Sequence, residues 1–180
     1  MGKPGPRLIA FGGLSGSGKS CVAQRFLTLM NQSSEAELLR SDVLRKQLLG
    51  CDPLERLDAD GYSWEATKAT FGALYQQSEV ILLKGKSVIA DAVFANEQQR
   101  SEIKNVAAKV GVQFQGVWLE AELKTRLHRV DRRVGDASDA DSEIVRLQES
   151  YNLGTIIWPK INASGTKNST FNSASALLKI

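Results

Sequence analysis

The sequence predicts an α/β fold built on a parallel sheet, and two observations lead to that prediction. Short apolar runs with strand-like composition alternate with longer segments of helical period, which is the pattern of repeated βαβ units. The first apolar run also leads directly into a glycine-rich segment, residues 13–20, that opens a helix. The 180 residues, 42% of them hydrophobic, suit one compact core, and no linker long enough to separate two cores is present. We therefore expect a single domain spanning residues 1–180.

Five apolar runs are expected to form the strands. Each is short and bounded by small or polar residues, as buried strands of a parallel sheet are. The fifth run contains Pro159, which belongs at an edge or a bulge because proline lacks the N–H that a central strand needs. The predicted strands are residues 8–11, 37–40, 87–91, 113–119 and 155–161.

The segments between these runs carry apolar residues at helical spacing, as Val22, Phe26 and Met30 do after the glycine-rich segment. A further helix is expected directly after Asp42. Two segments, residues 50–63 and 134–141, are polar and poorly periodic; we expect mobile loops there, with plain solvated connections as the alternative. The other predicted helices are residues 19–30, 64–83, 97–110, 121–134, 142–153 and 173–179.

The composition limits the kinds of molecule that this protein is expected to bind. The chain has 23 Lys and Arg against 20 Asp and Glu, and the resulting net charge of +3 is too slight to argue by itself for nucleic acid or an anionic membrane as a partner, so any binding of a polyanion must be local. The first apolar stretch is too short and too interrupted for a signal peptide or a membrane span, so we expect a cytoplasmic protein. Two cysteines and one histidine argue against a disulfide framework or a four-ligand zinc site.

The segment GLSGSGKS, residues 13–20, matches the phosphate-binding pattern G-x-x-x-x-G-K-[ST] in the required context of strand, loop and helix. Backbone N–H groups of such a loop wrap a phosphate, and the positive end of the following helix lies at the same place. Lys19 is expected to reach the β- and γ-phosphates of ATP, and the Ser20 hydroxyl to bind Mg²⁺. The residues expected to bind the nucleotide here are Gly13, Ser15, Gly16, Ser17, Gly18, Lys19, Ser20 and Cys21.

Two carboxylates follow predicted strands. Asp91 ends the run 87–91 and therefore lies at the carboxyl end of a parallel strand, where ligands bind in α/β sheets. There it is expected to hold Mg²⁺ through water, with a turn-capping role as the alternative. Asp42 follows the run 37–40, and two roles are open to it: cap of the next helix, or catalytic base.

Arginines cluster in the segment RLHRVDRR, where Arg126, Arg129 and Arg133 fall at i, i+3 and i+7 and so share one helix face. Guanidinium groups stay charged and bond phosphate oxygens in pairs, so we expect this face to address one phosphate chain. A solvated basic helix is the alternative. The acidic stretch DASDAD follows, and together they predict a lid at about residues 132–141.

In order along the chain, GLSGSGKS, RSDVLRKQLLG, SVIADAVF followed by Arg100, VWLEA and RVDRRVGDASDAD resemble the motifs of a family of small P-loop kinase-like ATPases. The domain of that family often occurs fused to an aminoglycoside-phosphotransferase-like domain. Its relatives include gluconate kinase, chloramphenicol phosphotransferase, zeta-type toxins and the phage polynucleotide 5′-kinase domain. The resemblance implies a three-layer P-loop NTPase fold, with a five-stranded sheet in the order 2-3-1-4-5.

The resemblance also implies roles for individual residues. It places Lys19 and Ser20 on ATP–Mg²⁺, makes Asp42 the acceptor-site base and puts Asp91 near the metal or the acceptor. It implies that the loop 162–165 packs on adenine. The remaining implied roles are phosphate contacts for Arg129 and Arg133, nucleotide contacts for Ser164 and Gly165, and an acceptor-facing position for Arg45 and Arg100.

These features predict an ATP- and Mg²⁺-dependent phosphotransferase that moves the γ-phosphoryl group to a hydroxyl of a small molecule. The chain is small, and the sequence shows no second domain, no repeats and no arginine-finger partner, as in metabolite kinases rather than motors. One alternative is a polynucleotide 5′-hydroxyl kinase, and another is an ATP-binding regulatory module without a phosphoryl acceptor. Nothing between residues 51 and 75 identifies the acceptor, and no motif indicates a protein partner.

Overall fold

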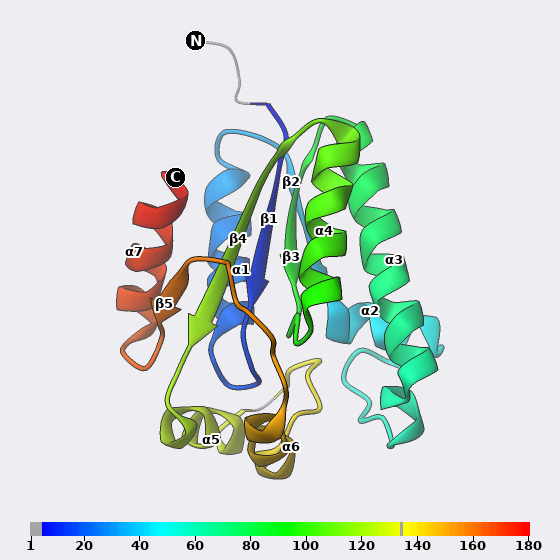
Figure 1. Ribbon diagram of the computed structural model, residues 1–180, viewed down its shortest axis with the longest axis vertical. Helices are drawn as coiled ribbons and strands as arrows, with labels where there is room; N and C mark the ends of the chain where they lie inside the picture. The colour runs from blue at the N-terminus through cyan, green and yellow to red at the C-terminus, as the bar shows by residue number, and fades with distance from the viewer. Residues whose placement is uncertain (1–4, 134) are drawn as a thin grey trace.

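The computed structural model describes residues 5–133 and 135–180. Its five strands form one parallel sheet in the order β2-β3-β1-β4-β5 (Figure 1). The predicted α/β class, the parallel sheet and the strand order are therefore confirmed. The strands are β1 (Arg7–Gly12), β2 (Ala36–Arg40), β3 (Ser87–Asp91), β4 (Gln113–Glu120) and β5 (Lys160–Asn162).

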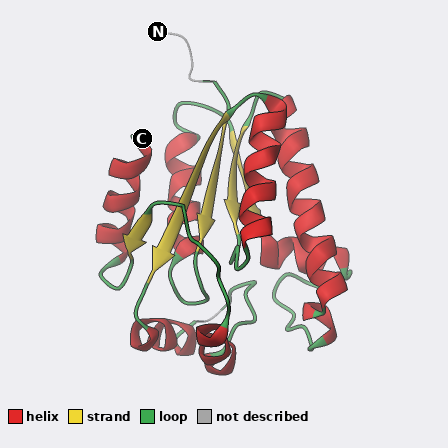
Figure 2. Cartoon of the chain, viewed as in Figure 1, coloured by secondary structure: helices red, strands yellow, loops and turns green. Residues whose placement is uncertain are grey.

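Helices cover both faces of this sheet and give the molecule three layers (Figure 2). Helices α1 and α7 pack on one face, and α3 and α4 on the other. In the described residues the helices are α1 (Lys19–Met30), α2 (Ser41–Leu48), α3 (Trp64–Leu83), α4 (Glu97–Val110), α5 (Leu123–Asp131), α6 (Ser142–Leu147) and α7 (Lys167–Leu178), with short 3₁₀ turns at Asp60–Tyr62 and Gln148–Ser150. No helix in this part of the chain combines the length and hydrophobicity that a membrane crossing requires.

The alternation of side chains along β1 divides the core between the two faces. Leu8 and Ala10 pack with α3 and α4, whereas Ile9 and Phe11 pack with α1 and α7. All four side chains are fully buried, because a central strand of a three-layer sandwich has no solvated face. The apolar run that predicted β1 is thus a consequence of helices on both faces.

The carboxyl ends of the strands meet at one edge of the sheet, where α5, α6 and the loop before α1 lie (Figure 1). The amino-terminal ends of the strands lie at the opposite end of the molecule. Because the loops that follow parallel strands gather at their carboxyl edge, residues far apart in the sequence meet there. This edge holds the candidate site.

Several predicted boundaries are wrong, and each has a local reason. The fifth strand is only Lys160–Asn162, because the preceding residues cross the sheet face, where Trp158 packs against Phe94 and Phe114. Helix α7 starts at Lys167 rather than at residue 173, since the Thr166 side chain caps it by accepting from Ser169 N–H. Helix α5 ends at Asp131 and α6 at Leu147, earlier than predicted; Val134, the predicted end of the former, lies outside the described residues.

Because Trp158 packs against Gly116, one methyl group added at Gly116 is expected to lower the stability of the protein. A Cβ added at Gly116 of β4 would lie 2.4 Å from Trp158 Cδ2, and the indole is fixed by its aromatic neighbours. Gly116→Ala should therefore lower the free energy of unfolding by about 1–3 kcal/mol, measured by urea titration. Gly72→Ala is the matched control, because nothing lies within 4 Å of the Cβ added there in α3. Equal stabilities of the two variants would contradict this packing account.

Candidate functional site

The loop between β1 and α1 has a backbone that only glycine permits at key positions. Gly13 and Gly16 have φ angles of 144° and 80°, and a Cβ there would lie 2.5 Å from Leu119 O and 2.6 Å from Arg126 O, respectively. Helix α1 begins at Lys19 as predicted, and no side chain caps it. Its positive end therefore stays open to an anion held by the loop.

Lys19 and Asp91 lie together beneath this loop, both buried. Burial lowers the pKa of Lys19, although the charges of Asp91 and Asp42 oppose that shift. Burial raises the pKa of Asp91, against Lys19, a hydrogen bond from Ser20 and the charge of Arg40. The Oδ2 atom of Asp91 accepts from Arg40 Nε at 3.3 Å, whereas Oδ1 is buried without a partner. The alternative prediction for Asp91 was a turn cap. Its carboxylate instead lies among charged groups.

Unpartnered polar atoms gather at this place. Three of the six buried side-chain atoms that lack a hydrogen-bond partner in the described residues lie here: Ser17 Oγ, Asp91 Oδ1 and Arg133 Nη1. Leaving such atoms unpaired costs about 1–3 kcal/mol each, so their concentration around one loop indicates a polar ligand. A carboxylate oxygen beside a serine hydroxyl is also a donor set that suits Mg²⁺, so Asp91 and Ser20 fit that ion.

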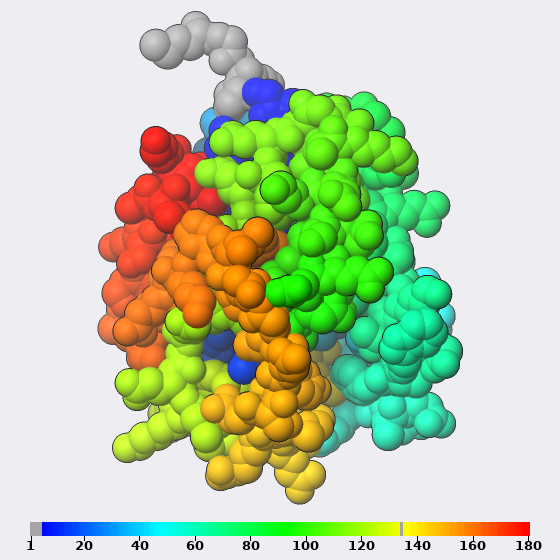
Figure 3. Space-filling model, viewed as in Figure 1, coloured from blue at the N-terminus to red at the C-terminus, as the bar shows by residue number. Residues whose placement is uncertain are grey.

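A cavity of about 530 Å³ lies between the loop, the arginine-rich segment and the start of α7. On the face drawn in Figure 3, blue atoms are visible in a separate hollow between the yellow-green and the orange segments. The cavity brings together residues 16–21 of the loop with Arg129 and Arg133, but not the predicted Gly13, Ser15, Ser164 and Gly165. Six further lining residues were not predicted as site residues. Those of the arginine-rich segment and the acidic stretch had a usable signal in the sequence, whereas those of α1 and α7 had none. The six are Val22, His128, Arg132, Asp136, Lys167 and Thr170.

The predicted common phosphate face of the arginines is wrong. Arg126 is buried and donates to Ser15 O at 2.9 Å and Val145 O at 3.2 Å, and it pairs with Glu149. Arg133 follows the end of α5 and so is not on that helix face. Of the three side chains, only Arg133 brings an unpartnered buried nitrogen to the cavity.

Arg129 ties two loops together. Its terminal nitrogens donate to Gly16 O at 3.3 Å, to Ser17 O at 3.1 Å, and to the carbonyls of Ala163 and Gly165 at 2.8 and 2.9 Å. These bonds hold the phosphate-binding loop to the loop after β5, where Ser164 Oγ accepts from Glu122 N–H. The expected phosphate contact of Arg129 is corrected to a clamp, because its terminal donors are taken by carbonyls.

The clamp predicts that charge alone does not replace Arg129. In Arg129→Lys, one ammonium cannot reach both loops, so we expect affinity for ATP to fall about tenfold, equivalent to about 1.4 kcal/mol. Isothermal titration with ATP–Mg²⁺ measures this. Arg146→Lys in α6 is the matched control, since that arginine is exposed. Equal affinities of the two variants would show that the clamp does not shape the nucleotide site.

Ser15 is also held by Gln148, a residue far from it in the sequence. Gln148 accepts from Ser15 N–H at 2.7 Å and donates to Ser15 Oγ at 3.0 Å, and both residues are buried. With Arg126 on its carbonyl, the N–H, the hydroxyl and the carbonyl of Ser15 are all bonded within the protein, and the expected nucleotide contact of Ser15 stays a prediction. Gln148 supports the loop, and no sequence signal could have found it within a polar segment.

Asp42 is not a helix cap. Helix α2 begins at Ser41, its N-cap position is Arg40, and no side chain caps it. Asp42 stands half-exposed in the first turn, where its charge acts on Lys19 and Asp91 on one side and on Arg45 and Tyr62 on the other. The cap role is therefore wrong, and the role of a catalytic base stays a prediction.

The two arginines expected at the acceptor have different surroundings. Arg45 is buried beside Tyr62, 4.7 Å from the ring centroid, and donates to Gly61 O at 2.8 Å while its Nε lacks a partner. Arg100 donates to the carbonyls of Phe94 and Leu153 at 2.7 and 2.5 Å. The acceptor role of Arg100 is therefore wrong, because its guanidinium joins backbone segments.

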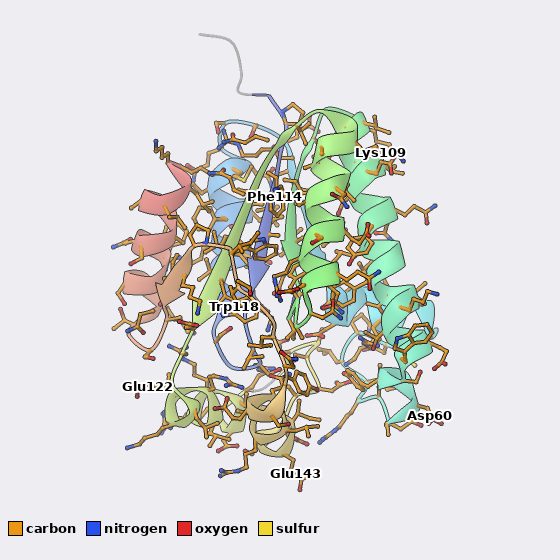
Figure 4. The ribbon with its side chains drawn as sticks, viewed as in Figure 1. Asp60, Lys109, Phe114, Trp118, Glu122 and Glu143 are labelled. Atoms are coloured by element: carbon orange, nitrogen blue, oxygen red, sulfur yellow. The ribbon has the colours of Figure 1, made fainter. Side chains whose placement is uncertain are left out.

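Residues 135–141, here called the acidic loop, contact the segment 50–63. Asp139 accepts from Lys46 Nζ at 2.7 Å, Tyr62 OH at 2.8 Å and Leu57 N at 3.0 Å. Asp136 accepts from Arg40 Nη2 at 2.7 Å. The two polar segments predicted as loops therefore meet each other, at the end of the molecule where Asp60 and Glu143 are labelled in Figure 4.

A comparison with models of protein families shows to which family this chain belongs. A model described as an AAA domain matches residues 8–151. The chain belongs to this AAA domain family. The match spans the phosphate-binding loop, Asp42, Asp91 and the acidic loop. No curated protein sequence matches the chain.

Solved structures similar to this AAA domain protein share its fold. The APS kinase CysC of Mycobacterium tuberculosis in complex with AMPPNP and APS has 21% identity and a TM-score of 0.70, with 98% of this chain and 99% of that one covered. A gluconokinase of Sinorhizobium meliloti 1021 has 18% identity and a TM-score of 0.65, covering 97% and 92%. A sugar kinase of Janibacter sp. HTCC2649 has 15% identity and a TM-score of 0.65, covering 98% and 96%. The AAA domain protein therefore has the P-loop NTPase fold of small kinases.

Proposed function

We propose that the protein is an ATP- and Mg²⁺-dependent phosphotransferase that moves the γ-phosphoryl group to a hydroxyl of a small-molecule acceptor. The P-loop fold serves hydrolases, switches and motors as well as kinases, so the fold alone does not carry the proposal. The observation that carries it is the Asp42 carboxylate, which is near enough to Lys19 for its charge to raise the pKa of that lysine and which caps no helix. A carboxylate in this position is what a kinase needs to take the proton of an acceptor hydroxyl.

The chain supplies the groups for transfer in a definite arrangement. The loop N–H groups and Lys19 hold the phosphates, and the unpartnered Nη1 of Arg133 bonds the oxygens on which negative charge spreads during transfer. The acceptor oxygen bonds to the γ-phosphorus as the bond to the β,γ-bridging oxygen breaks. Asp42 receives the hydroxyl proton, and ADP leaves with the electron pair of the broken bond.

Mg²⁺ would be held by Ser20 and by Asp91, directly or through water. When bound, the ion offsets negative charge on the β- and γ-phosphoryl oxygens. Asp91 is suited to this because its Oδ1 is buried without a partner while Arg40 fixes its other oxygen. The loop 162–165, clamped by Arg129, is proposed to pack on adenine, and the acidic loop to act as the lid over the transferring group.

The comparisons support this proposal in one respect. The similar APS kinase structure contains AMPPNP and APS together, which shows for that protein a nucleotide beside its second ligand on this fold. The proposed acceptor of the present chain lies on the side of Asp42 where its charge acts on Arg45 and Tyr62. We treat residues 1–180 as a single functional unit.

Transfer of labelled γ-phosphate tests the proposal. ATP labelled at the γ-phosphorus is incubated with Mg²⁺, the protein and a mixed pool of sugars, amino sugars, nucleosides and 5′-hydroxyl oligonucleotides. Label is expected in a small-molecule product with the wild type and not with Lys19→Ala, which removes the charge on the β- and γ-phosphates. Label in an oligonucleotide would instead identify a polynucleotide kinase. Tight ATP binding without any labelled product would favour a regulatory module.

A further inference from the structure

Arg40 joins the acidic loop to the carboxylate of the proposed metal site. Its Nε donates to Asp91 Oδ2 at 3.3 Å, and its Nη2 donates to Asp136 Oδ1 at 2.7 Å. Arg40 ends β2 and Asp91 ends β3, and the register of the two strands sets these residues side by side at the carboxyl edge of the sheet. A single guanidinium can bond two carboxylates at once because its donors point in different directions. The acidic loop therefore reaches the metal carboxylate through one side chain.

The two bonds of Arg40 differ in strength. The bond to Asp136 has the length usual for a charged hydrogen bond, whereas the bond to Asp91 is longer than most. Asp136 Oδ1 also accepts from Ser138 N–H at 2.9 Å, so the backbone of the acidic loop fixes the position of this carboxylate. Arg40 is therefore held mainly from the acidic loop, and its contact with Asp91 is the weaker of the two.

The charge of Arg40 acts against a cation at Asp91. The Oδ1 atom of Asp91 is buried without a partner and suits Mg²⁺, while Oδ2 faces the guanidinium. Like charges this close repel each other, and solvent screens them little because Asp91 is buried and Arg40 is largely covered. Asp136 offsets the charge of Arg40 from the other side. The affinity of the site for Mg²⁺ is therefore expected to depend on a residue of the acidic loop.

Asp136 also faces Arg133, and both residues line the cavity of the phosphate-binding loop. Although burial opposes the shift, hydrogen bonds from Ser138 and Arg40 and the charges of Arg40 and Arg133 lower the pKa of Asp136. Loss of the Asp136 charge thus affects two cations, and Arg40 is the one that bonds Asp91. A test must therefore vary Arg40 as well as Asp136 to separate the two contributions.

We propose that Arg40 is a positioning residue that couples the metal site to the acidic loop: Mg²⁺ binds more tightly while Asp136 holds Arg40, and the acidic loop is held more firmly while Mg²⁺ is bound. This inference rests on the proposed function, which places Mg²⁺ at Ser20 and Asp91. The two halves are one statement, because a coupling free energy between two sites acts equally in both directions.

The contacts of Arg40 give a physical reason for the second half. With a cation at Oδ1, less negative charge on Asp91 is left to attract the guanidinium. Arg40 then bonds Asp136 alone, which strengthens the contact that holds the acidic loop. Nucleotide without the metal leaves Arg40 shared between the two carboxylates. The acidic loop is thus held over the site more firmly by metal-loaded nucleotide than by nucleotide alone.

Binding of AMPPNP with and without Mg²⁺ tests the coupling without turnover. Isothermal titration in EDTA and in saturating Mg²⁺, at equal ionic strength, gives the factor by which the metal strengthens nucleotide binding. Binding in EDTA shows that each variant is folded, and effects on the nucleotide itself cancel in the factor. We expect Asp136→Asn to lower this factor about tenfold, within the usual range of coupling between sites, and Arg40→Gln to raise it. An unchanged factor in Asp136→Asn would overturn the inference.

The double variant separates Arg40 from Arg133. In the Arg40→Gln background, Asp136→Asn is expected to change the factor by less than about twofold, because the side chain through which it acts is gone. An equal loss in both backgrounds would assign the effect to Arg133 or to the charge of Asp136 itself, and the inference would fail.

Glu143→Gln is the matched control, because it removes one negative charge from an exposed residue that lies outside the ion pairs of the acidic loop. The factor by which Mg²⁺ strengthens AMPPNP binding should equal that of the wild type. A loss as large as that of Asp136→Asn would make general charge responsible and would overturn the role of Arg40.

Hydrogen exchange measures the effect of the metal on the acidic loop. The N–H of Ser138 is the probe, because it bonds to Asp136 within the loop. Adding Mg²⁺ to the AMPPNP complex is expected to slow exchange of this N–H at least about fivefold in the wild type. No slowing is expected in Arg40→Gln at full occupancy by AMPPNP. Equal slowing in both proteins would contradict a coupling through Arg40.

The outcomes distinguish this inference from the proposed function. Mg²⁺-dependent transfer of labelled phosphate, with an unchanged factor in Asp136→Asn, would uphold phosphotransfer and overturn the coupling. The expected factors without any labelled product would uphold the coupling and count against phosphotransfer. Nucleotide binding that Mg²⁺ does not strengthen in the wild type would overturn the coupling and remove the metal at Asp91 from the proposed function.

Discussion

Asp42→Asn is expected to lower the rate of phosphoryl transfer by about 10²–10⁴-fold, the usual contribution of a general base. Asparagine keeps the size of the side chain but cannot accept the acceptor proton. Because Asp42 does not line the cavity of the phosphate-binding loop and caps no helix, ATP binding and folding should change little. The turnover number for γ-phosphate transfer, compared with the ATP dissociation constant from titration calorimetry, measures this separation.

The matched control for this variant is Asp60→Asn, since Asp60 is an exposed acid in the neighbouring segment. Its turnover should equal that of the wild type. Full transfer activity in Asp42→Asn would show that another group takes the proton. Loss of ATP affinity together with turnover would place Asp42 in nucleotide binding instead.

Arg133→Ala is expected to lower the turnover number by about 10³–10⁵-fold, the range for an arginine that stabilises charge during phosphoryl transfer. The reason is the buried Nη1 without a protein partner, at a cavity lined by the phosphate-binding loop. The KM for ATP should change much less, because ground-state contacts to the phosphates remain with Lys19 and the loop. Steady-state kinetics at saturating acceptor separate the two parameters.

Lys124→Ala is the control for lost charge on the same segment, since Lys124 is exposed on α5. Equal turnover in Arg133→Ala and Lys124→Ala would remove Arg133 from the transfer machinery. A rise in the KM for ATP with unchanged turnover would assign Arg133 to ground-state binding only.

The parts of the fold that depend on local pattern were predictable from the sequence. Residues 19–30, 64–83 and 97–110 are helices with the predicted bounds, and residues 87–91 form the predicted strand. Each has a clear period or a clear terminating residue. Residues 155–161 also look like a strand, but the large ring of Trp158 packs over Gly116, and pairing with β4 resumes only at Lys160. An apolar run in the sequence does not show whether the segment will pair with a neighbouring strand or cross the face of the sheet.

The features of the candidate site that depend on local sequence could also be predicted, and those that depend on tertiary packing could not. The spacing of Gly13, Gly18 and Lys19 is itself the phosphate-binding geometry, so that element was visible in the sequence. The spacing of Arg126 and Arg129 correctly predicted a shared helix face, but what a face contacts is decided by tertiary packing. These arginines bond carbonyls of the phosphate-binding loop rather than a phosphate. Gln148 has no local signal, because its role exists only once Ser15 is beside it.

The most direct test of the central claim follows the γ-phosphorus of ATP by ³¹P NMR in the presence of Mg²⁺, the protein and the acceptor pool. The account predicts a growing phosphate monoester resonance that replaces the γ-phosphate signal of ATP, with little inorganic phosphate. In Asp42→Asn, the ester resonance should be nearly absent. Release of inorganic phosphate alone, or an unchanged ATP spectrum at full occupancy of the nucleotide site, would contradict phosphotransfer to a hydroxyl.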